Sequence, residues 1–176
     1  MREHAGADDE GSMPMKFNLP TPPLPPLAGF EELSVGQRFA LGSVELTRDD
    51  IMEFARQFDP QPFHLDEAAA ERSIFGGLAA SGFHTISAIF GLGARSGLLA
   101  EVSLGGSGVE EARWLKPVRP DQPLSLTWTI ESIAPSKSRP GRATVRIRSD
   151  VTDSTGEPVM RMVLVHIMAG KGAAMP

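Results

Sequence analysis

The chain has 176 residues, 41% of them hydrophobic and 22% charged, a composition typical of one soluble globular domain. It contains no cysteine, which excludes disulfides, thiolate metal sites, iron–sulfur clusters and a cysteine nucleophile. The net charge of −5 disfavours nucleic-acid partners, and the lack of a recognisable membrane span or export signal leads us to expect a cytoplasmic protein.

The first 29 residues differ in composition from the rest of the chain. They hold six of the fifteen prolines, which lack the amide hydrogen that helices and sheets require, and their first twelve residues are mostly charged or small. We therefore expect residues 1–29 to be a disordered tail and residues 30–176 to be a single domain. The proline-rich stretch could serve as a docking peptide, as a tether, or as an arm lying along the domain.

The segments that follow show helical patterns. Thr47 followed three residues later by Asp50 resembles a capping box and predicts a helix start, and the prolines after residue 59 end that helix. Its apolar residues recur at i, i+3, i+4 and i+7, namely Ile51, Phe54, Ala55 and Phe58. Asp66 caps a short helical piece, and residues 81–92 predict an almost uncharged helix that is buried on most sides.

The second half of the chain has the pattern of strands. Residues 124–131 and 142–151 alternate between apolar and polar side chains, which indicates strands with one buried face. Residues 159–168 are apolar on both faces and predict either a central strand or a subunit interface. With further strands at 38–46 and 109–116, we expect an α+β fold in which an antiparallel sheet wraps one long apolar helix.

The candidate chemistry lies just after the first predicted helix, where Asp59 and His64 are five residues apart. Pro60 and Pro62 restrict the backbone between them, so a rigid turn would hold the two side chains at a fixed separation. A carboxylate beside an imidazole forms an acid–base pair that can hold one water molecule between its members. The alternative is that Asp59 only caps the turn and His64 is an ordinary buried side chain.

A run of small residues at 76–82 leads into the uncharged helix. Small side chains allow a ligand to come close, and a helix start presents unpaired N–H groups that can stabilise negative charge on a carbonyl oxygen. The alternative is tight packing of the helix on the sheet. Together with the Asp59–His64 pair, this helix start suits the addition of water to an activated carbonyl compound, or its removal, without a covalent nucleophile.

The turn resembles the signature Asp-x-x-Pro-x-His-x-Asp of the MaoC-like dehydratases, the (R)-specific enoyl-CoA hydratase family; its residues here are Asp59, Pro62, His64 and Asp66. The similarity continues in Phe-Gly-Gly at 75–77, Ser-Gly at 81–82 and Lys-Pro-Val at 116–118, and covers residues 30–168. The resemblance implies a hotdog fold, in which a curved antiparallel sheet wraps a long central helix. It also implies a homodimer or higher homo-oligomer, with two sheets joined edge to edge.

By this resemblance the reaction converts trans-2-enoyl-CoA to (R)-3-hydroxyacyl-CoA, or the reverse. Asp59 and His64 would activate the water that adds at C3, one of them would supply the proton at C2, and the Gly82 amide would polarise the thioester carbonyl. The implied substrate contacts are Ser81, Phe63 and Phe75. The resemblance implies no metal and no redox cofactor; coenzyme A or an acyl carrier protein is part of the substrate.

The sequence departs from the family pattern at Ser81, where well-known members carry histidine. A serine cannot act as a base, but the Gly82 amide is retained, so the change bears on acyl preference and does not exclude activity. The two other histidines of the predicted domain, His84 and His166, are expected to be packing residues.

Five basic residues on a turn and a strand could bind coenzyme A phosphates or could form a solvated strand face: Lys137, Arg139, Arg142, Arg146 and Arg148. Lys116 and Arg119 are alternative candidates for the phosphates. Two other functions stay open, namely a non-catalytic acyl-thioester-binding or partner subunit, and a hotdog acyl-CoA thioesterase. The spaced Asp59–His64 pair favours hydration, because thioesterases usually place a lone carboxylate on the helix.

Overall fold

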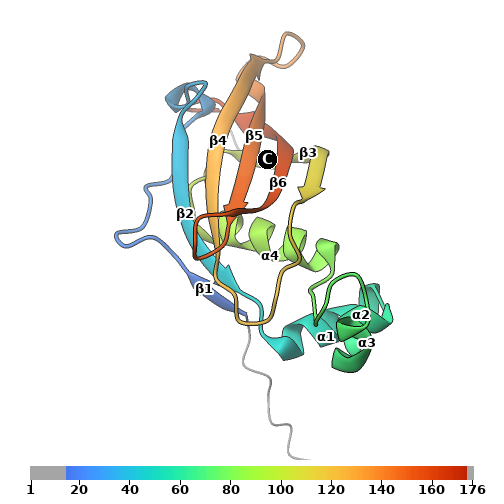
Figure 1. The fold of residues 1–176 in the computed structure, drawn as a ribbon. Coiled ribbons are helices and arrows are strands. Elements are labelled where there is room, and N and C mark those ends of the chain that lie inside the picture. The colour runs from blue at the N-terminus through green and yellow to red at the C-terminus, as the bar shows by residue number, and fades with distance from the viewer. Residues whose placement is uncertain (1–14, 174–176) are drawn as a thin grey trace, which may run out of the picture.

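The structure, a computed structural model, describes residues 15–173 and consists of one antiparallel sheet wrapped around one long helix (Figure 1). Its strands are β1 (Lys16–Asn18), β2 (Arg38–Glu45), β3 (Ser103–Trp114), β4 (Leu124–Pro135), β5 (Arg142–Thr152) and β6 (Pro158–Ala169). Its helices are α1 (Arg48–Phe58), α2 (Pro62–Leu65), α3 (Glu67–Glu71) and α4 (Gly82–Arg95), with a 3-10 turn, η1, at Phe30–Glu32. Within residues 15–173, no helix is both long and apolar enough to cross a bilayer.

The strands lie in the order β1-β2-β4-β5-β6-β3, and every neighbouring pair is antiparallel. This confirms the expected α+β fold, a curved antiparallel sheet around a central helix, with β1 added to the strands that we expected. β6 lies between β5 and β3, which explains why its residues are apolar on both faces: it is a central strand.

α4 lies against one face of the sheet and forms the centre of the core. Its Ile89 and Leu92 are fully buried, and alternate residues of β5 meet the same core, among them Val145, Ile147 and Val151. Gly93 permits close packing of α4 on β4, because a Cβ there would lie 2.3 Å from the ring of Trp128. The second half of α4 is thus held close to the sheet.

The N-terminal segment differs from the expectation of disorder through residue 29. β1 pairs with β2, and Leu27 is buried and donates its amide hydrogen to the Leu98 carbonyl at 3.0 Å. Gly42 allows this pairing, because its φ is 96° and a Cβ there would lie 1.9 Å from the oxygen of Asn18. The prolines suggested an unattached tail, but the apolar residues around them pack on the core: Met15, Phe17, Leu24 and Leu27. Residues 1–14 of the predicted tail lie outside the described residues.

α1, α2 and α3 form a cluster of short helices near the N-terminal end of α4 (Figure 1). Thr47 and Asp50 form the predicted capping box at the start of α1. Pro62 occupies the first turn of α2, and Asp66 caps α3 by accepting a backbone N–H. These caps set the chain turns that bring residues 59–64 close to the first turn of α4.

Candidate active site

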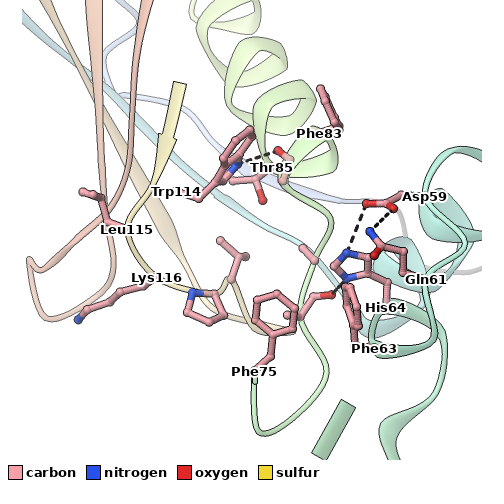
Figure 2. Close-up of a pocket in the computed structure, with 15 residues that line it drawn as sticks. Asp59, Gln61, Phe63, His64, Phe75, Phe83, Thr85, Trp114, Leu115 and Lys116 are labelled. Carbon is pink, nitrogen blue, oxygen red and sulfur yellow. Dashed lines mark hydrogen bonds and ion pairs between the residues drawn. The ribbon is translucent and has the colours of Figure 1, made fainter. Parts of the chain in front are cut away.

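A cavity of about 410 Å³ opens between α2, the start of α4 and the segment that follows β3 (Figure 2). Five of the six predicted site residues line it: Asp59, Phe63, His64, Phe75 and Gly82. Most of the remaining wall is apolar, and it includes side chains that the sequence analysis did not single out, such as Thr85, Trp114 and Leu115. The structure therefore brings the two predicted features, the Asp59–His64 turn and the helix start, to one cavity.

Asp59 follows the last residue of α1, and its carboxylate is held by two neutral hydrogen-bond donors. The Ser81 hydroxyl donates to Oδ2 and the Gln61 side-chain amide donates to Oδ1, each at 2.7 Å. Burial raises the pKa of Asp59, but these two hydrogen bonds outweigh it, so the pKa lies below the usual range of an aspartate. Asp59 is therefore an ionised hydrogen-bond acceptor at neutral pH.

His64 is buried, and a backbone contact fixes its orientation. Its Nδ1 lies 2.7 Å from the carbonyl oxygen of Ala79. A carbonyl only accepts, so Nδ1 carries a hydrogen, and in the neutral form of the ring Nε2 is then the bare nitrogen. Nε2 lies 3.3 Å from Asp59 Oδ2. Figure 2 marks this contact with a dashed line.

The carboxylate and the neutral imidazole thus turn two hydrogen-bond acceptors toward each other. Two acceptors this close need a shared donor, and a water molecule can supply one O–H group to each of them. Such a water keeps its lone pairs free to attack an electrophile in the cavity. The predicted pair of Asp59 and His64 is thus formed, in a geometry that suits the activation of water.

The first turn of α4 carries the second predicted feature. Within residues 15–173, nothing accepts a hydrogen bond from the Gly82 amide, so this N–H is available at the positive end of the helix. The indole of Trp114 covers Gly82, where a Cβ would lie 2.6 Å from the ring, and its Nε1 donates to the Gly82 carbonyl at 3.1 Å. No larger residue fits at position 82 unless the indole moves.

Phe63 and Phe75 form an apolar wall beside His64. Their ring centroids are 5.0 Å apart, and Phe63 meets the His64 ring edge-on with centroids 4.6 Å apart. Ser81, the remaining predicted substrate contact, does not line the cavity. It is fully buried, and its hydroxyl contacts Asp59 instead.

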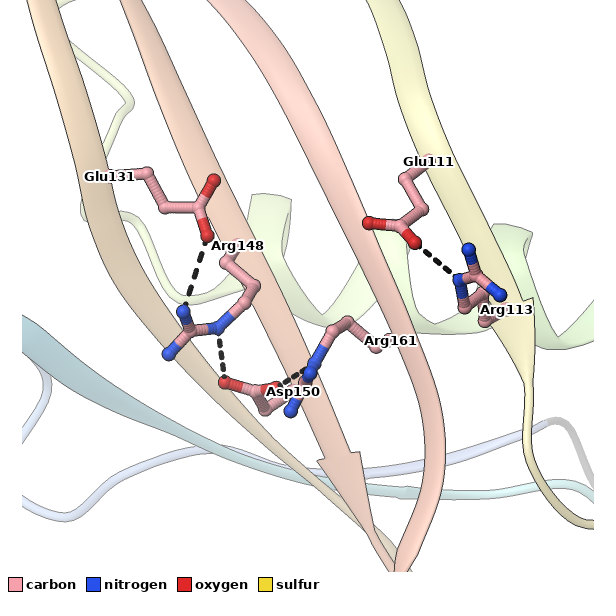
Figure 3. Close-up of polar contacts among 6 residues, drawn as sticks. All are labelled: Glu111, Arg113, Glu131, Arg148, Asp150 and Arg161. Atoms are coloured by element: carbon pink, nitrogen blue, oxygen red, sulfur yellow. Dashed lines mark hydrogen bonds and ion pairs between the residues drawn. The ribbon is translucent and has the colours of Figure 1, made fainter.

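Four of the seven basic residues considered for phosphate binding have protein partners: Lys116, Arg119, Arg146 and Arg148. The Arg119 guanidinium donates to three carbonyl oxygens of the loop before α4, those of Phe75, Gly77 and Leu78. Lys116 lies at the cavity wall, and its ammonium pairs with Glu157. Arg146 and Arg148 of β5 lie on the sheet face opposite α4. Arg146 binds Glu110, and Arg148 binds Glu131 and Asp150, as Figure 3 shows. These pairs favour the interpretation of a solvated strand face.

His84 and His166 are buried and do not line the cavity. His84 stacks on Phe54 with ring centroids 4.5 Å apart, and burial lowers the pKa of both histidines. They therefore occupy the packing positions that we expected. In the part of the chain that the structure describes, no group of three or more histidine, aspartate or glutamate side chains could hold a metal ion.

Some cavity residues could have been found from the sequence, and others could not. Gln61 lies inside the signature, between Asp59 and Pro62, and Trp114 and Leu115 directly precede the Lys-Pro-Val motif. Neither position, however, reveals its partner, because Trp114 meets Gly82 across 32 residues of chain.

Comparison with known proteins agrees with this architecture. A family model described as the MaoC-like domain matches residues 32–152. The crystal structure of a MaoC-like dehydratase from Rhodospirillum rubrum is 43% identical, with a TM-score of 0.77 over 82% of this chain and 99% of that chain. The uncharacterized protein YdeM of Bacillus subtilis is 34% identical over 115 residues, which are 65% of this chain and 82% of that protein. The R-hydratase PhaJ1 of Pseudomonas aeruginosa, 24% identical, has the same fold, with a TM-score of 0.61 over 85% of this chain and 94% of that chain.

Proposed function

This chain belongs to the MaoC-like dehydratase family, whose hotdog fold it has, and we propose that it is a hydro-lyase acting on acyl thioesters. The proposed reaction adds water to a trans-2-enoyl thioester to form an (R)-3-hydroxyacyl thioester, or removes it. The observation that carries the proposal is the 3.3 Å separation of Asp59 Oδ2 and His64 Nε2 at the wall of an apolar cavity. The R configuration and the coenzyme A or carrier-protein thioester are taken from the family resemblance.

In the proposed reaction, water held between Asp59 and His64 loses one proton to the pair as its oxygen bonds to C3. The electrons of the C2–C3 double bond move toward the thioester carbonyl, whose oxygen gains negative charge. The Gly82 N–H, at the positive end of α4, stabilises that charge. The pair then returns a proton to C2, so the sum is the addition of one water molecule. No electrons are gained or lost, so the reaction calls for no redox cofactor.

The apolar wall of the cavity supports an acyl chain as the bound group. Phe63 and Phe75 stand beside His64, and Trp114 covers Gly82, so a chain that enters here has its first carbons between the water site and the polarising amide. Substrates with a charged group next to C3 would have to place that charge against aromatic rings. We therefore propose straight or branched apolar enoyl groups as the substrate class.

The test is hydration of a panel of trans-2-enoyl-CoA thioesters of increasing chain length, followed by the loss of enoyl absorbance, with chiral analysis of the product. We expect turnover of at least one member and an R product. Release of free thiol without 3-hydroxyacyl product would instead identify a thioesterase. Saturable binding of the same thioesters without any turnover would identify a non-catalytic acyl-binding subunit. Because of the Asp59–His64 geometry, we expect neither thioesterase activity nor binding without turnover.

We also propose that the protein is a homodimer joined through α4 and β3. β3 is an edge strand of the sheet, and exposed apolar side chains gather on it and on the adjacent face of α4. Phe83 and Phe90 are seven residues apart on α4 and therefore share one helix face, and Trp114 of β3 packs against Phe83 with ring centroids 6.2 Å apart. A monomer rarely exposes such a patch, so a second copy is the occupant that we propose.

A further inference from the structure

Ser81 makes two contacts that a helix cap alone does not need. Its side chain is fully buried at the start of α4, and its hydroxyl oxygen accepts a hydrogen bond from the Phe83 amide at 3.3 Å. The same hydroxyl donates to Asp59 Oδ2 at 2.7 Å. The first contact is the usual N-cap hydrogen bond of a serine. The second joins the start of α4 to the Asp59 carboxylate, at the C-terminal end of α1.

The direction of the hydroxyl hydrogen follows from these contacts. Because the Phe83 amide donates to the serine oxygen, the hydroxyl hydrogen is free to point to Asp59, and an ionised carboxylate can only accept it. The oxygen that it reaches, Oδ2, is also the oxygen that lies 3.3 Å from His64 Nε2. Gln61 holds the other oxygen, Oδ1, at 2.7 Å, so the carboxylate is fixed at both ends.

We propose that Ser81 is a positioning residue for the reaction proposed above: its hydroxyl holds Asp59 Oδ2 beside His64 Nε2 and ties this water site to the first turn of α4. The Gly82 amide is the next group along the chain from Ser81, so one residue sets both the place of the attacking water and the place of the polarising N–H. The catalytic part of this role rests on the proposed function. The contact itself can be tested without substrate.

Two substitutions separate this role from helix capping. Ser81→Ala removes the hydroxyl and is also a poor cap, whereas Ser81→Gly removes the hydroxyl and is nearly as good a cap as serine. Thr47→Ala is the matched control, because Thr47 caps α1 through the same kind of contact but has no contact with Asp59. A merely structural role of Ser81 would give Ser81→Ala and Thr47→Ala similar effects, and would leave Ser81→Gly close to the wild type.

The experiment combines turnover of an enoyl-CoA substrate with carbon-13 NMR titration of the Asp59 carboxyl, followed in each folded variant. We expect both Ser81 variants to lose turnover by about 10²-fold, the loss expected when a reacting group is displaced by about 1 Å, with little change in KM. We also expect the Asp59 pKa to rise in both, because the strongest hydrogen bond that lowers it is gone. Thr47→Ala should lower Tm without changing either readout.

The two readouts also distinguish the failure of this inference from the failure of the proposed function. If the wild-type protein hydrates enoyl thioesters but Ser81→Gly keeps wild-type turnover and an unchanged Asp59 titration, the positioning role is overturned while the function stands. If the wild-type protein hydrates no enoyl thioester, the Asp59 titration alone tests the hydrogen bond between Ser81 and Asp59. An unchanged Asp59 pKa in Ser81→Gly would then show that this hydrogen bond does not form.

Discussion

At the scale of single residues, the site depends on which atoms are left without hydrogen-bond partners. The Ala79 carbonyl accepts from Nδ1 of His64, Gln61 donates to Oδ1 of Asp59, and Ser81 donates to one side of Oδ2. Nε2 and the second lone pair of Oδ2 are the positions that remain for water. A histidine of the other tautomer would present an N–H to Asp59 and would close the site by a direct hydrogen bond. The catalytic competence that we propose is therefore set by a backbone carbonyl as much as by the two side chains.

His166 gives a prediction about stability. It is buried on β6, and neither ring nitrogen has a hydrogen-bond partner within residues 15–173. Burial lowers its pKa, so the folded protein keeps it neutral while the unfolded chain takes up a proton below about pH 6.5. The folded pKa lies below the unfolded one, so this group favours the folded state above that pH and costs stability as the pH falls.

We expect His166→Leu to raise the free energy of unfolding by about 1–3 kcal/mol, because it removes buried polar atoms that lack partners. The gain should be larger at pH 5.5 than at pH 7.5. Urea denaturation at the two pH values measures it. The prediction is wrong if the variant loses stability, or if its gain is the same at both pH values. Either result would show that the His166 imidazole has hydrogen-bond partners in the folded protein.

At the scale of elements, the position of α4 against the sheet decides whether the site forms. Gly91 and Gly93 both lie in the second half of the helix, but only Gly93 faces β4. At Gly93 a Cβ would lie 2.3 Å from the Trp128 ring, whereas at Gly91 the nearest atom is 3.6 Å away. The same substitution should therefore have opposite effects at the two positions.

Gly91→Ala should stabilise the protein by up to about 1 kcal/mol, because alanine is the better helix former. Gly93→Ala gains the same propensity but forces the helix away from Trp128, so we expect a net loss of about 1–3 kcal/mol. Thermal or urea unfolding of the two variants under one condition provides the comparison. Equal stabilities would mean that α4 does not press on the sheet as closely as the structure indicates.

The sequence allowed the helices and strands to be predicted where a local pattern was strong, as in the capping box at Thr47 and the alternation in β5. It did not reveal β1, because Lys16–Asn18 pairs with residues of β2 that lie 25 or more positions away (Asn18 with Ser43) and needs the close approach of Asn18 to Gly42. The same limit holds at the site. The Asp59–His64 pair is local and was predicted, but the Ser81–Asp59 contact joins residues 22 apart that only the packing of α4 brings together.

At the scale of the whole molecule, the two faces of the sheet carry different kinds of side chains. The face against α4 is apolar and forms the core, and the opposite face carries ion pairs that link neighbouring strands (Figure 3). Arg148 and Arg161 hold Asp150 between them, and these hydrogen bonds outweigh the effect of burial and keep the Asp150 pKa below its usual range. Exposed apolar side chains gather on α4 and β3, and this patch is the surface that we propose for a second copy.

The proposed dimer makes a direct prediction. Phe90 is about half exposed on α4, and Phe90→Asp would place a charge in the interface, whereas Val35→Asp changes an exposed apolar residue in the turn before β2. Size-exclusion chromatography with light scattering should give twice the chain mass for the wild-type protein and for Val35→Asp, and the monomer mass for Phe90→Asp. A wild-type protein that is monomeric at micromolar concentration would refute the interface.

The central claim is that Asp59 and His64 together activate one water molecule, and the most direct measurement is the rate of crotonyl-CoA hydration by wild type, Asp59→Asn and His64→Ala. We expect each folded variant to lose turnover by about 10²–10⁴-fold, as is usual when an acid–base group is removed. The double variant should be little slower than the slower single one, because the two groups act as a unit. Wild-type turnover in either single variant, with the fold verified by circular dichroism, would contradict the account.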